Sequence, residues 1–184
     1  MKEKLNHKGT VQLESERLFL RRLTVKDAQK VFENWTSDDE VSKYVRWDTH
    51  LNVEVTRAWL KDCEEAAGNL TFYDWGIILK DMNEPVGSIG AFLSGQQEDQ
   101  YEVGYVLGKR YWNMGIATEA LKCMMDFLIK EVGIKHFIAK HAVENPASGA
   151  VMRHVGFEYA KLCKSRSFSG LREFECKEYY LDLL

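Results

Sequence analysis

The spacing of apolar residues in the first third of the chain predicts one strand followed by three helices. Residues 17–23 alternate imperfectly between apolar and polar and predict a strand. Residues 24–35 predict a helix, because Thr24-Val25-Lys26-Asp27 resembles a capping box with Asp in place of Glu. A short second helix is expected over 37–44, and Asn52 is placed to cap a third that ends near residue 67.

The rest of the chain predicts a hairpin, two further helices and four more strands. Strands are expected at 71–80, 85–93 and 101–107, a helix at 115–132, a strand at 135–143, a helix at 147–155 and strands at 157–167 and 172–183. Gly156 is placed to end the second of these helices. The order predicts a mixed α/β fold in one domain over residues 1–184, with residues 1–10 polar and loosely held.

Composition narrows the class of protein. The 184 residues are 45% hydrophobic and carry a net charge of −3, which disfavours a dedicated nucleic-acid binder. No apolar run is long enough for a membrane helix, and the charged start predicts no secretory signal. The four cysteines form no C-x-x-C pair, so we expect free thiols in a reducing cytoplasm and no metal site.

The segment from Tyr101 to Ala120 carries the first candidate chemistry. It predicts a strand, a short loop and a long helix that begins near Gly115. The first N–H groups of a helix have no partner within it and bind phosphate where a glycine lets the ligand approach. A purely structural glycine at a tight turn explains the same pattern. The motifs of P-loops and of dinucleotide-binding proteins are both absent.

A second segment, His141 to Phe157, leaves a strand and enters a helix through Asn145-Pro-Ala-Ser148. Together the two segments resemble the GNAT superfamily of acyl-CoA-dependent N-acetyltransferases. Trp112-x-x-Gly115-x-Ala117 is similar to the family's pyrophosphate loop, with Trp in place of Gln or Arg. The Tyr-Trp pair before the glycine, Asn145 to Ser148, and the opening segment 13–21 resemble the RimJ/RimL-like branch, whose members acetylate N-termini of ribosomal proteins.

The resemblance implies a twisted, mostly antiparallel sheet flanked by helices, and acetyl-CoA as the acetyl donor. It implies that the end of the 101–107 strand binds the pantetheine arm and thioester, that the next turn holds the pyrophosphate, and that Asn145 binds the pantetheine arm. The cofactor-binding residues expected on this basis are Tyr105, Val106, Leu107, Asn113, Met114, Gly115, Ile116, Ala117, Thr118, Asn145 and Ser148.

Two residues are expected to carry the chemistry. Glu102 is the candidate general base, and a carboxylate paired with Arg or Lys across the sheet is its structural alternative. Met152 stands where many family members have a tyrosine acid, so the resemblance assigns that role to Ser148. A first-turn residue that bonds its own backbone is the alternative for Ser148. Glu119 is expected only to neutralise the helix start or to pair locally.

Among the reactants, the acceptor is the one that the sequence specifies least. In the family, the first helices and their connecting loop cover the acceptor, so we expect Tyr44 and Trp47 to bind it; for Trp47 a place in the core stays open. A protein N-terminal amine is the expected acceptor of direct acetyl transfer. Small amines such as polyamines, aminoglycosides or amino acids are the first alternative, and a non-catalytic acyl-CoA sensor is the second. Monomer and homodimer both stay open.

Overall fold

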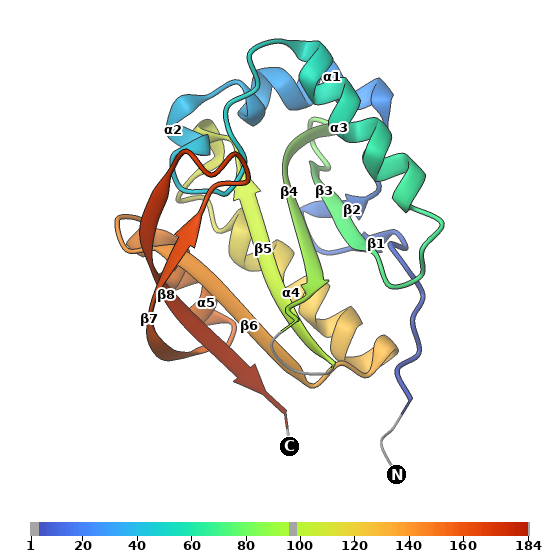
Figure 1. Cartoon of the computed structure of the whole chain (residues 1–184). Coiled ribbons are helices and arrows are strands. Elements are labelled where there is room, and N and C mark those ends of the chain that lie inside the picture. The colour runs from blue at the N-terminus through green and yellow to red at the C-terminus, as the bar shows by residue number, and fades with distance from the viewer. Residues whose placement is uncertain (1–3, 96–98, 184) are drawn as a thin grey trace.

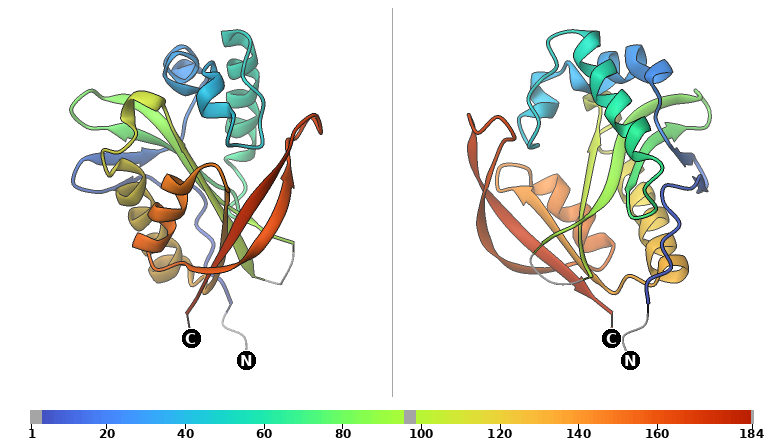
Figure 2. Two further views of the ribbon diagram at one scale, coloured as in Figure 1. Left: turned by 90° about the vertical axis from the view of Figure 1, so that its left-hand side faces the viewer. Right: turned by 45° about the vertical axis from the view of Figure 1, so that its right-hand side comes forward.

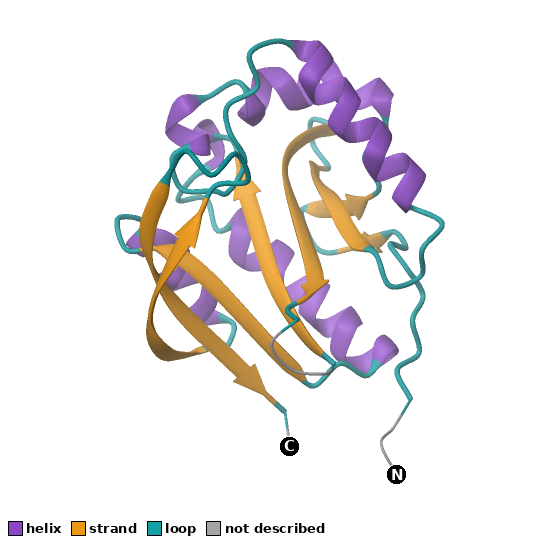
Figure 3. Ribbon diagram, in the orientation of Figure 1, coloured by secondary structure: helices purple, strands orange, loops and turns teal. Residues whose placement is uncertain are grey.

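The computed structural model describes residues 4–95 and 99–183, and in this part of the chain eight strands form one sheet. The strands are β1 (Leu13–Glu14), β2 (Leu18–Arg21), β3 (Tyr73–Leu79), β4 (Glu84–Leu93), β5 (Gln100–Leu107), β6 (His136–Ala142), β7 (Glu158–Arg166) and β8 (Glu173–Asp182). Their order across the sheet is β1-β2-β3-β4-β5-β6-β8-β7, and Figure 3 shows the sheet between two groups of helices.

The helices are α1 (Ala28–Val31), α2 (Asp39–Ser42), α3 (Val53–Ala66), α4 (Ile116–Phe127) and α5 (Pro146–His154). The short helical segments η1 (Val25–Asp27) and η2 (Phe32–Thr36) flank α1, η4 (Leu128–Val132) extends α4, and η3 (Lys109–Tyr111) lies between β5 and α4. Helices α1 to α3 lie together at one end of the sheet, and α4 and α5 pack on one face (Figures 1 and 2). None of the described helices is both long and apolar enough to cross a membrane.

Two apolar clusters hold these layers together. The larger one joins the sheet to α4 and α5 and contains Trp75, Phe137 and Met152. The smaller one joins α1, α2 and α3 to the sheet around Trp35 and Leu60, both almost completely buried. Burial of these side chains is the main force that fixes the helices on the sheet.

The central feature of the sheet is the junction of β5 and β6, the parallel pair among the described strands. The two strands pair only from Gln100–Val103 to His136–Ala139. Beyond that point β5 continues to pair with β4 as far as Leu107, and β6 continues to pair with β8 as far as Ala142. The strands therefore splay, and Figure 1 shows the gap widening toward the end of β5.

The predicted fold class and most element positions are confirmed, including the caps at Thr24 and Asn52. The backbone N–H of Thr24 donates to Asp27 at 2.9 Å, and Asn52 accepts from the N–H groups of Glu54 and Val55. Gly156 follows α5 with φ +101°, the left-handed conformation expected of a helix-ending glycine. The strand β1 was not predicted, because two residues carry no periodic signal.

In the segment that was expected to be loosely held, residues 4–10 make hydrogen bonds to distant elements. The Asn6 N–H donates to the Val132 carbonyl at 2.9 Å, and the His7 ring lies 2.9 Å from the Tyr73 hydroxyl. Thr10 is buried and donates to the Phe72 carbonyl. A polar segment is ordered here because its partners come from distant strands and helices. Residues 1–3 and 96–98 lie outside the described residues.

Candidate active site

The splay leaves one side of each strand without a β-sheet partner. Residues 104–107 of β5 pair only with β4, and residues 140–142 of β6 pair only with β8. Backbone N–H and C=O groups that face such a gap need other hydrogen-bond partners. A ligand chain with alternating amide donors and acceptors satisfies that need, so this gap fits the pantetheine arm of coenzyme A.

The turn after β5 has the geometry of an anion site. Asn113 and Gly115 have φ values of +60° and +74°, and Gly115 directly precedes α4. These left-handed residues reverse the chain, so that the first N–H groups of α4, at residues 116–118, begin the helix at its positive dipole end. The φ of Gly115 also supports the structural explanation of this glycine. The two explanations are compatible, because the backbone conformation that reverses the chain also presents the N–H groups of the candidate phosphate site.

Tyr105 and Ser148 are brought together across the splay. The Tyr105 hydroxyl lies 2.7 Å from the Ser148 carbonyl oxygen and 2.9 Å from Ser148 Oγ. Asn145 caps α5, and its Oδ1 accepts from the Ser148 N–H at 3.3 Å. Three residues expected at the cofactor thus lie in one hydrogen-bonded group at the start of α5.

Glu102 lies on the face of β5 opposite Tyr105, since residues three apart in a strand point to opposite faces. Its carboxylate accepts from Lys140 Nζ at 2.9 Å, and Lys140 also lies 3.7 Å from Glu178. Burial lowers the pKa of Lys140, but the hydrogen bond to Glu102 and the negative charges of Glu102 and Glu178 together outweigh it and leave the pKa above its usual value. The structural alternative for Glu102, a lysine partner across the sheet, is therefore present, and a permanently charged ammonium lies beside the carboxylate.

Gly104, two residues after Glu102 on the same face, is exposed although β5 is a central strand. A Cβ built on Gly104 would meet no atom within 4 Å. The sheet is therefore open to solvent where the two strands begin to part, next to the candidate base. This space is where an acceptor amine can approach.

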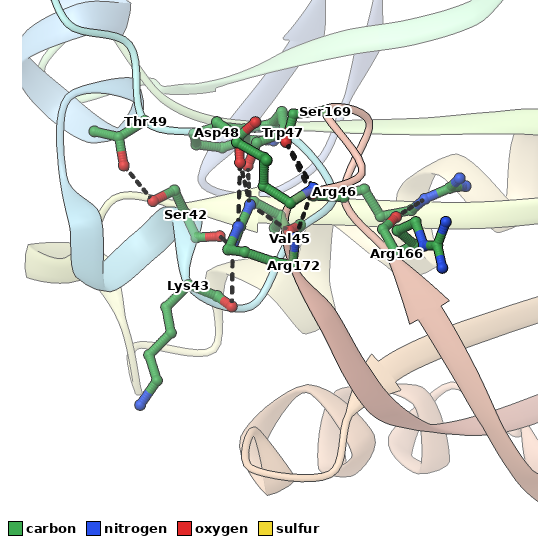
Figure 4. A network of polar contacts seen from close by, with 12 residues as sticks. Ser42, Lys43, Val45, Arg46, Trp47, Asp48, Thr49, Arg166, Ser169 and Arg172 are labelled. Atoms are coloured by element: carbon green, nitrogen blue, oxygen red, sulfur yellow. Dashed lines mark hydrogen bonds and ion pairs between the residues drawn. The ribbon is translucent and has the colours of Figure 1, made fainter.

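The loop between α2 and α3, residues 43–52, is held across the molecule by Arg172, which follows the turn between β7 and β8 (Figure 4). The Arg172 guanidinium donates to the Ser42 carbonyl at 2.9 Å and to the Trp47 carbonyl at 2.7 Å, and it pairs with Asp48 at 3.0 Å. Two further carbonyls, of Lys43 and Val45, lie at 3.4 and 3.3 Å. One side chain thus joins this loop to the β7–β8 hairpin.

The two expected acceptor residues lie in this loop. Trp47 is half-buried, packs on the smaller apolar cluster and has its ring 5.7 Å from that of His50. Tyr44 is also half-buried, with the Lys43 ammonium 5.3 Å from its ring. Trp47 therefore makes core contacts, the alternative that the sequence left open, while its backbone forms part of the loop that Arg172 holds.

Three residues at the site have contacts that sequence analysis missed. Arg172 was not singled out, and Arg17 was considered only as part of a strand pattern. Glu119 bonds to Ser15 and Arg17, more than a hundred residues earlier in the chain, instead of pairing locally. No local pattern predicts such pairs. Met152 is buried in the larger apolar cluster, which fits its lack of a proton to donate.

A split parallel pair, an anion-binding turn and open backbone along the gap define an acyl-CoA-dependent acyltransferase. Comparison with known proteins agrees. A family model described as the acetyltransferase (GNAT) domain matches residues 17–158, so the chain belongs to the GNAT acetyltransferase family. It is an N-acetyltransferase that uses acetyl-CoA.

Relatives with a similar sequence or fold are found in several bacteria. The chain is 28% identical over 146 residues to the uncharacterized N-acetyltransferase p20 of Bacillus licheniformis, covering 79% of this chain and 82% of the relative. A GNAT-family acetyltransferase from Bacillus anthracis is 28% identical with a TM-score of 0.79, covering 94% of this chain and 98% of that one.

Two solved structures share the fold at lower identity. A putative ribosomal-protein-serine acetyltransferase from Vibrio cholerae has a TM-score of 0.82 at 18% identity, covering 96% of this chain and 99% of that one. The microcin C7 self-immunity acetyltransferase MccE, solved with acetyl-CoA and AMP, has a TM-score of 0.79 at 18% identity, covering 92% and 94%.

Proposed function

We propose that the protein transfers the acetyl group directly to a primary amine in a ternary complex, with Glu102 and Ser148 as catalytic residues. One observation carries this proposal: the two candidates lie on either side of β5 where it leaves β6. Glu102 faces the open space over Gly104, and Ser148 bonds to Tyr105 on the face that carries α4 and α5.

The chemistry divides between these two faces. Acetyl-CoA supplies an acetyl thioester, the electrophile that the amine attacks. The Glu102 carboxylate accepts a proton from the acceptor ammonium, directly or through one water, and so frees the lone pair of the amine. The C–N bond forms, the C–S bond of the thioester breaks, and coenzyme A leaves as a thiolate. The Ser148 hydroxyl passes a proton to this thiolate and regains the proton that the attacking nitrogen releases, while the backbone of residues 104–107 orients the thioester and stabilises its oxygen.

We propose that the acceptor is the N-terminal amine of a protein. We also propose that the enzyme belongs to the RimJ/RimL-like branch and acts in the cytoplasm. The support is the resemblance of the Tyr-Trp pair before Gly115, of Asn145 to Ser148 and of the opening segment 13–21 to that branch. The name of the Vibrio cholerae protein with the same fold points the same way. Tyr44 and Trp47, in the loop held by Arg172, are the proposed acceptor contacts.

A small polar amine is the second candidate. A cleft of about 460 Å³ lies beside the loop between α2 and α3, lined by Asp39, Ser42, Lys43, Asp48, Thr49 and Arg172. Its volume falls in the range of small-molecule sites. Its lining is mostly charged and hydroxylic, which suits an acceptor with several polar groups.

Release of coenzyme A from acetyl-CoA, measured against ribosomal N-terminal peptides, polyamines, aminoglycosides and amino acids, tests the proposal. Peptide turnover that falls in both Glu102→Gln and Ser148→Ala, but not in the edge-strand control Ser165→Ala, supports it. Turnover with small amines alone selects the second candidate. Cofactor binding without turnover across the whole panel contradicts both candidates and favours a non-catalytic sensor.

A further inference from the structure

The carboxylate of Glu119 joins α4 to the segment before β2. Oε1 accepts from Ser15 Oγ at 2.7 Å and from the Arg17 backbone N–H at 2.8 Å, and Oε2 accepts from Arg17 Nε at 2.7 Å. The Glu119 side chain is only 19% exposed. Three donors on one shielded carboxylate hold the Arg17 side chain in a single direction.

That direction leads to the turn before α4. Arg17 Nη1 donates to the Met114 carbonyl at 2.9 Å. Arg17 Nη2 has no hydrogen-bond partner among residues 4–95 and 99–183, and it lies 3.4 Å from the place where a Cβ on Gly115 would be. The side chain is 44% exposed, so a solvent-borne anion can reach it.

The side chains next to this turn do not offer a positive charge to an anion bound there. Trp112 occupies the position where the resembling motif has Gln or Arg, and its indole N–H donates to the Leu107 carbonyl at 2.9 Å. This hydrogen bond lies within the turn, so the indole N–H is already used. Arg110 lies over the ring of Tyr111, 5.1 Å from its centroid. Lys109 lies 4.0 Å from Glu40.

We propose that Arg17, oriented by Glu119, is a cofactor-binding residue: Nη1 fixes the 113–115 turn and Nη2 contacts the diphosphate of acetyl-CoA. A guanidinium suits this task because one planar group can hold a carbonyl and still present a donor to a phosphate. The inference rests on the proposed placement of the diphosphate at residues 113–118. It adds a charged contact from the segment before β2, distant in sequence, to a turn that otherwise offers backbone N–H groups.

Calorimetric titration separates this role from a structural one. We expect Arg17→Met to bind acetyl-CoA at least ten-fold more weakly than wild type, and added salt to weaken its binding less. Both proteins should bind S-acetylpantetheine, which lacks the diphosphate, with equal affinity. Glu119→Gln and Arg17→Lys should give intermediate losses of acetyl-CoA affinity, and they test the role if Arg17→Met does not fold. The matched control is Arg57→Met on α3, whose Arg57 pairs locally with Glu54.

Two results overturn the inference while the proposed function stands. One is acetyl-CoA affinity in Arg17→Met within two-fold of wild type. The other is an equal loss of affinity for acetyl-CoA and S-acetylpantetheine, which would show a structural role. Absence of acetyl-CoA binding in wild type would overturn both the inference and the proposed cofactor site.

Discussion

The Tyr105 hydroxyl on β5 lies 2.9 Å from Ser148 Oγ on α5, across the gap where β5 and β6 part. Burial raises the pKa of Tyr105, so this tyrosine stays protonated at neutral pH. Its hydroxyl therefore has one proton to donate, and the Ser148 carbonyl at 2.7 Å is an available acceptor. The pair fixes the Ser148 side chain next to the proposed thioester site.

Replacement of Ser148 by Ala should lower kcat by roughly 10²-fold, the usual scale for loss of a general acid. The KM for acetyl-CoA should change little, because the backbone contacts of the cofactor remain. Tyr105→Phe should give a smaller loss, since it removes only the group that orients Ser148. Steady-state kinetics with the best acceptor measures both. Unchanged kcat in Ser148→Ala would remove it from the mechanism.

Gly104→Val should fill the space over the sheet without harming the fold. Since a Cβ at Gly104 meets no atom within 4 Å, the variant should melt within a few degrees of wild type. The added side chain should raise the acceptor KM more than ten-fold, because it points to the face of Glu102. Gly87→Ala is the contrasting control, since its Cβ would lie 2.1 Å from the Val106 carbonyl and should lower the Tm. An unaltered acceptor KM in Gly104→Val would place the acceptor elsewhere.

Arg172→Met should loosen the α2–α3 loop. The variant loses hydrogen bonds to the Ser42 and Trp47 carbonyls and the Asp48 ion pair, which should cost about 1–3 kcal/mol of unfolding free energy. Hydrogen exchange at residues 43–48 should accelerate, while acetyl-CoA affinity stays the same. Arg172→Lys should also fail to restore protection, because an ammonium cannot span these carbonyls. Full protection in either variant would show that the loop is held by other contacts.

The Asp74 carboxyl should make the free energy of unfolding depend on pH. Burial raises the pKa of its carboxyl to about 7, and a long contact to the Cys63 thiol only partly offsets this. The unfolded carboxyl loses its proton near pH 4, whereas the folded one keeps it to about pH 7. The folded state thus binds more protons in this window, so the free energy of unfolding falls as pH rises through it and levels off above pH 7.

Asp74→Asn should therefore remove this fall. Relative to wild type, the variant should gain several degrees of Tm between pH 5 and pH 8.5. Asp62→Asn, a change at the exposed residue next to Cys63 in the sequence, serves as the control. Parallel Tm curves for wild type and Asp74→Asn over this pH range would contradict the raised pKa.

Local signals in the sequence were sufficient for most of the fold, whereas long-range contacts were not. The cap at Asn52 and the glycine after α5 are local, so the structure confirms both. On α3 the apolar residues do not by themselves mark the buried face: Val55 is 44% exposed, whereas Thr56 is buried and hydrogen-bonded to Thr36. A buried threonine with a polar partner cannot be told from a surface threonine by its spacing.

The site residues also divide into those set by local signals and those set by long-range contacts. The turn at Gly115 and the capping Asn145 could be predicted, because a motif of a few residues forms each of them. Arg172 bonds to residues more than 120 positions away, and Arg17 bonds to Glu119 at a separation of 102. Such pairs depend on strand order and on the direction of each side chain, which a single sequence does not encode locally.

The most direct test of the central claim is calorimetric titration of acetyl-CoA into wild type and Gly115→Val. A β-branched residue at φ +74° should distort the turn before α4 and remove its N–H groups from the diphosphate. Our expectation is one site per chain in wild type and at least ten-fold weaker binding in a folded Gly115→Val. Equal affinity in the two proteins, or no binding in wild type, would contradict it.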